Sequence, residues 1–148
     1  MKCADANPIC PLCRVPNPTT EAEVLARLQR RADKGDKVAQ CTLGEAYVQG
    51  NYGLKKNMTR SVHFYELSAA QGYSNAQFSL AVCYIHGLGV KMDKKKALHY
   101  WTMAASQGDS EAQFNTGLMY YRKAIKKRRR ALLFLKAQTH DADLRPRT

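Results

Sequence analysis

The stretch ICPLCR, residues 9–14, holds the two side chains whose spacing most suggests chemistry. Cys10 and Cys13 stand in a C-x-x-C arrangement, in which two thiolates bind a zinc ion or form a redox pair. A zinc site needs four ligands, and Cys3 is the only cysteine that precedes Cys10 in the sequence. Three interpretations stay open: accessible thiols without a ligand, a partial metal site completed by Cys3 or an outside ligand, or a redox dithiol, which the lack of a βαβ pattern disfavours.

No other set of residues indicates catalysis. His63 and His99 recur at the same place in two similar segments, but no third ligand recurs beside them. The sequence contains no G-x-S-x-G, no phosphate-binding loop and no H-E-x-x-H. We therefore expect a protein that is not an enzyme and has no cofactor, with zinc as an incomplete exception at Cys10 and Cys13.

Composition and charge describe one domain with a basic end. The chain has 148 residues, a net charge of +12 and five cysteines, an odd number that argues against a disulfide framework. No signal peptide is apparent, and the apolar run at 131–135 is too short to span a membrane. We expect a cytoplasmic location. The run KKRRR at 126–130 leaves open nuclear import, binding to nucleic acid or an acidic surface, and the simpler interpretation of a solvated helix face.

The chain repeats itself with a period of 36 to 37 residues. The hexamers GDKVAQ, GYSNAQ and GDSEAQ begin at residues 35, 72 and 108, and each is followed by a second stretch in register. Residues of one helix face, most of them apolar, recur at i, i+4 and i+8 in each unit, and glycines end the helical segments of the first two units, so each unit is predicted to be two helices. The positions that carry this pattern are Ala39, Leu43 and Tyr47; Ala76, Leu80 and Tyr84; and Ala112, Thr116 and Tyr120.

The segment AQFSLAVCYIHGLGVKMDKKKALHYWTMAASQG, residues 76–108, resembles the Sel-1-like repeat, a relative of the tetratricopeptide repeat. The resemblance implies an all-α fold, an α-solenoid of antiparallel helix pairs, preceded here by an irregular N-terminal tail. It also implies an adaptor that binds a protein or peptide partner in the solenoid groove.

The predicted organisation has six parts. The parts are an irregular tail at 1–18, a capping helix at 19–34, repeat 1 at 35–72, repeat 2 at 73–108, a degenerate repeat 3 at 109–140, and a disordered tail at 141–148. The capping helix has Thr19 or Thr20 as its N-cap, and Glu23 closes a capping box.

The third repeat departs from the others. With a shift of 34, RRRALLFL at 128–135 aligns with KKKALHYW at 94–101, which predicts that Leu132, Phe134 and Leu135 dock on the second repeat. Two residues and both loop glycines are missing between its two helices. We therefore expect this pair to be distorted or joined without a clean turn.

Two further expectations concern partners. C-P-x-C followed by Arg14 and more prolines resembles the last ligand pair of a RING-type zinc domain, which implies, as an alternative, a fragment of a RING-type ubiquitin ligase whose repeats bind substrate. For the adaptor, the predicted partner-binding residues lie on the first helix of each unit. They are Gln40, Glu45, Gln77 and Gln113.

Overall fold

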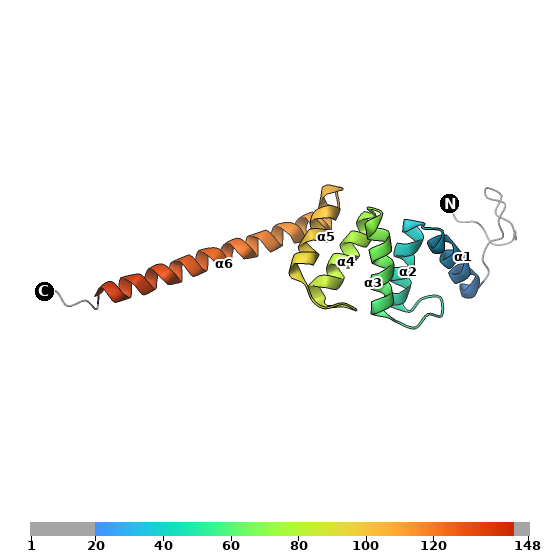
Figure 1. Cartoon of the computed structure of the whole chain (residues 1–148), viewed down its shortest axis with the longest axis horizontal. Helices are drawn as coiled ribbons and strands as arrows, with labels where there is room; N and C mark the ends of the chain where they lie inside the picture. Colours follow the sequence, from blue (N-terminus) through green and yellow to red (C-terminus); the bar gives the residue numbers. More distant parts are fainter. Residues whose placement is uncertain (1–19, 144–148) are drawn as a thin grey trace.

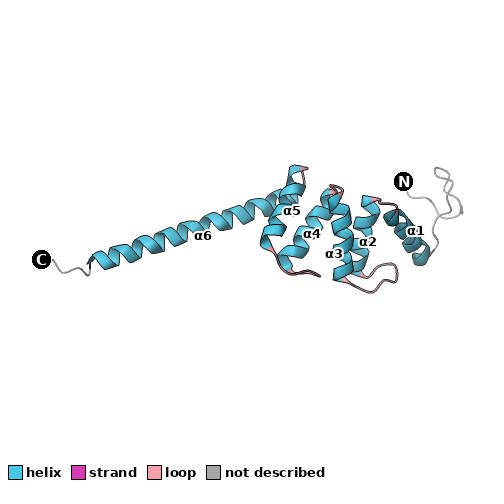
Figure 2. Cartoon of the chain, in the orientation of Figure 1, coloured by secondary structure: helices cyan, strands magenta, loops and turns pink. Residues whose placement is uncertain are grey.

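The computed structural model describes residues 20–143, without the side chains of Phe134 and 137–143. Within that range every regular element is a helix (Figure 2), which confirms the all-α prediction. Helices α1 to α5 stand side by side in a row, and α6 extends away from its end (Figure 1). The bounds are α1 Glu21–Asp33, α2 Lys37–Gln49, α3 Met58–Ala70, α4 Ser74–His86, α5 Lys94–Ser106 and α6 Ser110–Asp143.

Helix α1 covers the start of the first repeat. Thr20 is its N-cap, and the Thr20 and Glu23 side chains each accept a hydrogen bond from the other residue's backbone N–H. Leu25 and Leu28 pack against a cluster that includes the fully buried Leu43 of α2. The helix thus covers apolar surface that α2 would otherwise expose to water.

The two complete helix pairs turn in the same way. Gly50 and Gly87 end α2 and α4 with φ of 77° and 71°, in the left-handed region that glycine adopts without a steric penalty. Asn57 and Asp93 cap α3 and α5, and each donates its backbone N–H to a tyrosine carbonyl at 2.9 Å. In each pair, the loop therefore has a fixed conformation at the end of the first helix and at the start of the second helix.

The core follows the repeat. Leu43 and Leu80 are 0% exposed, and Gly44 leaves room for the Tyr65 ring, which an added Cβ would approach to 2.6 Å. Tyr47 and Tyr84, which the repeat pattern places on the inner face of their helices, are buried, and so are Cys41, Cys83 and Trp101.

The third pair does not form. Helix α6 continues for 34 residues through the place where α2 and α4 end, because residues 122–128 contain neither a glycine nor a capping side chain. The prediction that Leu132 and Leu135 dock on the second repeat is wrong, because these side chains are 52% and 56% exposed. Tyr120, which the register predicts to be a packing residue, is 53% exposed because no returning helix covers it.

The two predicted tails lie wholly or partly outside the described residues. Helix α6 includes residues 141–143, the first three residues of the predicted tail at 141–148. Residues 1–19 and 144–148 lie outside the described part of the chain, and the prediction for Cys10 and Cys13 lies there too. Among residues 20–143, no helix combines the length and the apolar character needed to cross a bilayer.

Candidate functional site

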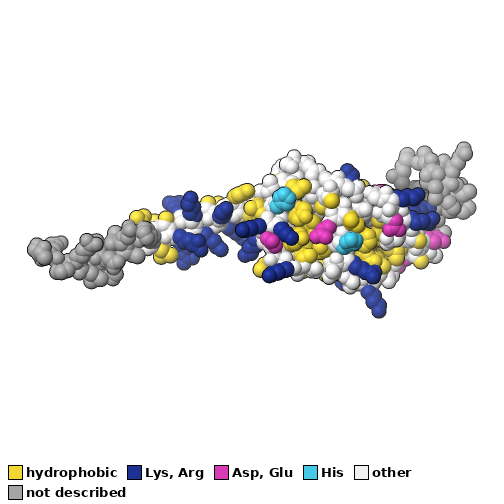
Figure 3. Space-filling model, viewed as in Figure 1, with side chains coloured by type: hydrophobic (Ala, Val, Ile, Leu, Met, Phe, Trp, Pro, Cys, Tyr) yellow, Lys and Arg dark blue, Asp and Glu magenta, His cyan; other side chains and the backbone are white. Residues whose placement is uncertain are grey.

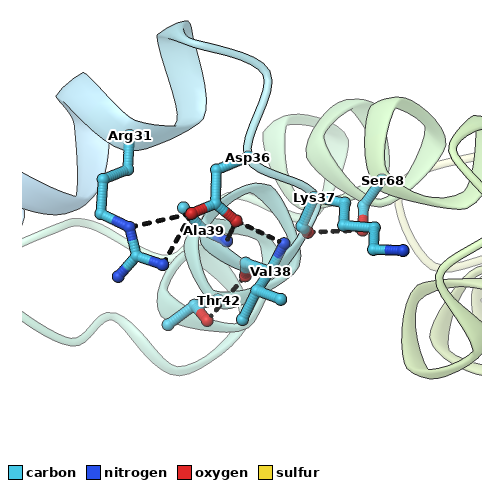
Figure 4. A network of polar contacts seen from close by, with 7 residues as sticks. All are labelled: Arg31, Asp36, Lys37, Val38, Ala39, Thr42 and Ser68. Atoms are coloured by element: carbon cyan, nitrogen blue, oxygen red, sulfur yellow. Dashed lines mark hydrogen bonds and ion pairs between the residues drawn. The ribbon is translucent and has the colours of Figure 1, made fainter.

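The junction of α1 and α2 is held by one carboxylate (Figure 4). Asp36 accepts hydrogen bonds from the Val38 and Ala39 N–H groups with one oxygen, and from the Arg31 guanidinium at 2.9 and 2.6 Å with the other. The Arg31 hydrogen bond and these N–H groups hold the pKa of Asp36 below its usual value. Ser68 of α3 donates to the Lys37 carbonyl at 2.7 Å. These side chains join helices and leave little polar capacity for a ligand.

The repeated glutamines have the same kind of structural role. Gln40 donates to the Ala32 carbonyl at the end of α1 at 3.2 Å, and Gln77 donates to Ala69 at the end of α3 at 3.4 Å. Each then accepts a hydrogen bond from the glutamine that caps the next helix, Gln71 at 2.7 Å and Gln107 at 2.8 Å. The glutamines therefore add a side-chain hydrogen bond to helix-end carbonyl groups that also accept from the backbone N–H groups of Gly35 and Gly72.

This arrangement differs from the predicted partner-binding role. Gln40 and Gln77 are 6% and 1% exposed, whereas contact with a partner requires an accessible side chain. Glu45 and Gln113 are exposed, with Glu45 accepting a weak hydrogen bond from Cys41 and Gln113 donating to the Ala105 carbonyl at 3.2 Å. Only these two of the four predicted residues lie where a partner could reach them.

Replacing Gln77 should destabilise the fold. In Gln77→Ala the Ala69 carbonyl and the Gln107 amide lose a partner, so we expect a loss of about 2 kcal/mol in the free energy of unfolding. Urea denaturation measures it. Gln113→Ala is the matched control, because Gln113 holds the same repeat position in the exposed third unit, and it should change stability by less than about 0.5 kcal/mol. Equal effects would contradict the structural role.

A repeated set of aromatic and basic side chains lies on the body of the solenoid. In the first unit Tyr47 and Phe64 stack with ring centroids 5.7 Å apart, and Arg60 lies over the Tyr47 ring at 5.6 Å. Arg60 also donates to the Tyr47 hydroxyl at 3.2 Å, and His63 meets Phe64 edge-on at 5.7 Å. The stacking of the two rings and the cation–π contact of Arg60 therefore stabilise one arrangement of these side chains.

The second unit repeats this set. Tyr84 and Tyr100 stack at 5.9 Å, Lys96 lies 5.1 Å from the Tyr84 ring centroid, and His99 meets Tyr100 edge-on at 5.4 Å. The Tyr84 hydroxyl donates to Glu66 of α3 at 3.3 Å, which links the two units. Burial and the Glu66 carboxylate raise the pKa of Tyr84, so its hydroxyl stays protonated as a donor.

We call these repeated sets the aromatic surface. It consists of Tyr47, Arg60, His63, Phe64, Glu66, Tyr84, Lys96, His99 and Tyr100. A hollow of about 400 Å³ adjoins it, lined by Tyr84, Val90, Lys91, Met92, Asp93 and Lys96. On the face that Figure 3 presents, histidine and apolar side chains gather over α3 to α5. Half-buried rings beside accessible charges can contact both apolar and acidic parts of a partner.

Sequence reasoning missed this surface, although a signal existed. Phe64 and Tyr100 are aromatic residues at the same position of the two repeats, inside α3 and α5. A basic residue lies four positions before each of them on the same helix. His63 and His99 are exposed neighbours of these rings. Within residues 20–143, no group of three or more histidine, cysteine or acidic side chains is placed to hold a metal ion.

The two buried cysteines should react slowly. Burial raises the pKa of Cys41 to about 12 and that of Cys83 to about 11, so both remain protonated at pH 8, and only the thiolate is nucleophilic. We expect alkylation by iodoacetamide to be roughly a hundredfold slower or more in buffer than in urea. Mass spectrometry of the two peptides measures each rate separately. Equal rates in buffer and in urea would contradict this account.

Comparison with known proteins agrees with the geometry. The Sel1 repeat family matches residues 37–73, 74–109 and 110–135. The fold is similar to a protective antigen of uropathogenic Escherichia coli strains with an SLR fold, at 32% identity and a TM-score of 0.67, over 75% of this chain and 23% of that one. It is also similar to a Sel1 repeat protein from Oxalobacter formigenes, at 34% identity and a TM-score of 0.63, over 64% and 71% of the two chains.

A curated relative covers less of the molecule. An F-box protein from Arabidopsis thaliana is 41% identical over 68 residues, which are 45% of this chain and 18% of that protein. The chain thus spans less than a quarter of this relative and of the E. coli antigen. The three repeat matches, by contrast, cover most of the present sequence. The chain belongs to the Sel1 repeat family.

Proposed function

We propose that this chain is a non-enzymatic protein-interaction scaffold that binds a partner protein through its aromatic surface. Sel1 repeat proteins bind protein partners, which supports a scaffold in general terms. The observation that carries the proposal is the recurrence of one stacked, cation-flanked ring pair at Tyr47–Phe64 and Tyr84–Tyr100. Two equal sets on neighbouring repeats give a partner two equivalent anchors.

The chemistry of the surface indicates the character of the partner. Arg60 and Lys96 are exposed and lie over tyrosine rings, which favours a segment that carries carboxylates beside apolar side chains. Tyr47 and Tyr84 are buried and hold the cations in place instead of making the contact themselves. The side chains free to touch a partner are therefore mainly those of α3 and α5.

Site-specific photo-crosslinking tests the proposal. A photoreactive amino acid at His63 or His99 should form crosslinks to a partner in cells, whereas one at Glu45 or Gln113 should not. All four sites are exposed, so the comparison separates the aromatic surface from the partner-binding residues predicted from sequence. The purified partner should then bind the chain saturably, and Arg60→Glu with Lys96→Glu should weaken this binding. Crosslinks confined to Glu45 and Gln113 would contradict the proposal.

Zinc content tests the alternative of a RING-type ligase. That alternative depends on Cys10 and Cys13, and a RING-type domain binds two zinc ions through about eight ligands. Because only Cys3 is available to join the pair before the first helix, we expect well below about one zinc ion per chain by elemental analysis of protein purified without chelator. About two ions per chain would revive the ligase, and Cys10→Ser should then lower the content.

A further inference from the structure

The outward face of α6 carries a regular apolar stripe. Its positions are spaced alternately by four and three residues, the spacing that forms a straight seam between paired helices. Within it Phe114, Tyr121 and Ile125 are 70%, 64% and 47% exposed, and no described helix covers them. We call the stripe the α6 seam; it consists of Phe114, Leu118, Tyr121, Ile125, Arg128, Leu132 and Leu135.

The first half of the seam continues an interface that exists elsewhere in the solenoid. One repeat earlier, the same positions of α4 are Phe78, Val82 and Ile85, and they pack against a cluster that contains Trp101 of α5. Gly117 of α6 likewise corresponds to Gly44 of α2. At Gly44 an aromatic ring of the next helix fills the space above the glycine, whereas nothing lies within 4 Å of a Cβ at Gly117. The face is therefore built to receive a helix.

The seam has unlike flanks. One flank consists of small residues, Gly117, Ala124 and Ala131, which allow the backbone of a second helix to approach closely. The other flank carries Arg122 and Arg129, and Arg128 interrupts the seam itself. Figure 3 shows Lys and Arg side chains gathered along α6 with apolar side chains beside them. An occupant must therefore supply apolar residues along its centre and carboxylates along one edge.

The positive charge of α6 disfavours a second copy of the chain as the occupant of the α6 seam. Between Glu111 and Asp141 the sequence has no acidic residue but eight lysines and arginines. In an antiparallel pair of α6 helices, the Arg122 and Arg129 flanks would face each other; in a parallel pair, Arg128 would face its own copy in the seam. Like charges in these positions oppose association.

We propose that α6 is a docking helix for an acidic amphipathic helix of a partner protein. The partner's apolar residues cover the α6 seam, and its carboxylates pair with Arg122, Arg128 and Arg129. This surface is separate from the aromatic surface on α3 and α5, so either one can bind while the other fails.

Two matched peptides test the proposal with the full chain. Each is a synthetic helix of about 28 residues, four heptads, with leucine at the seam positions. One peptide carries glutamate at the flanking positions, and the other carries lysine. Fluorescence anisotropy should show saturable binding of the glutamate peptide, weakened by added salt, and no binding of the lysine peptide. Equal binding of both peptides, or of neither, would overturn the proposal.

Variants of exposed residues locate the binding. Ile125→Asp and Leu132→Ser should each weaken the glutamate peptide by roughly tenfold or more, and circular dichroism checks that α6 remains helical. Arg122→Glu with Arg129→Glu reverses two charges beside the seam and should weaken it by a similar factor. Lys126→Glu with Arg130→Glu is the control, since it makes the same charge change on the opposite side of the helix, and it should weaken binding by less than about threefold.

Three results would give α6 another role. Equal losses in the two double variants would mean attraction without a defined seam. A stable dimer of the chain alone in analytical ultracentrifugation would make a second copy the occupant. Tighter binding to phosphatidylserine vesicles or to a DNA duplex than to the glutamate peptide would identify an acidic surface instead of a helix as the ligand. Each of these results overturns the proposal, and none of them bears on crosslinks formed from His63 or His99.

Discussion

Gly89→Ala is expected to lower the free energy of unfolding by about 3 kcal/mol or more, the sum of two penalties at one residue. Gly89 has φ of +70°, where alanine is strained. A Cβ there would also lie 2.5 Å from the Met58 carbonyl group and 2.8 Å from the Thr59 nitrogen, both backbone atoms at the start of α3. The start of α3 cannot move aside without losing its Asn57 cap. The added methyl group would therefore push the loop of the second repeat away from the first repeat. Urea denaturation of the purified variant measures the effect.

Gly53→Ala is the matched control for this change. Gly53 has nearly the same φ, +76°, in the corresponding loop of the first repeat, but nothing lies within 4 Å of its Cβ position. The free energy of unfolding of this variant should fall by only about 1 kcal/mol, which is the conformational penalty alone. The difference between the two variants isolates the close approach between repeats. If both variants lost the same amount, the loop of repeat 2 would not be held against α3 as described.

Leu80→Ala should cost about 3 kcal/mol, because it opens a cavity where the two repeats meet. Leu80 is 0% exposed and lies in one cluster with Tyr65 of α3 and Ala97 of α5, so the cluster that surrounds it is built from helices of both repeats. The helices around it are each fixed at both ends by caps, which limits how far they can close the cavity. Thermal and urea unfolding should show the same loss.

Leu67→Ala provides the comparison for Leu80. Leu67 is the same residue type on α3 but is 40% exposed, so its truncation removes little buried surface and should cost less than about 1 kcal/mol. Similar losses for the two leucines would mean that the interior between repeats is loosely packed, contrary to the burial of Leu80.

Local signals in the sequence were sufficient for the two complete repeats. Thr20 and Glu23 defined the capping box, and Gly50 and Gly87 defined the ends of α2 and α4, because caps and left-handed glycines depend on neighbouring residues alone. In the third unit, two local signals point to different structures. Its apolar residues align with α5, but residues 122–128 favour an uninterrupted helix, and without a turn Leu132 and Leu135 remain exposed.

The candidate site was harder to predict for a different reason. Recurrence at Gln40 and Gln77 shows that a side chain matters, but it does not say whether the side chain faces a partner or a neighbouring helix end. The deciding fact is the distance to the Ala32 and Ala69 carbonyls, which depends on how successive helices pack. The stacking of Tyr47 on Phe64 likewise joins residues of two helices, so no local pattern contains it.

The length of α6 has a consequence for valency. The seam runs over the 22 residues from Phe114 to Leu135, about 32 Å at the helical rise, and it leads away from the row of helices. Ligands on α6 and on α3 and α5 would therefore be held apart by a stiff spacer instead of competing for room. Such a spacer fixes their separation, and it gives high avidity only to assemblies whose own two contact points match that distance.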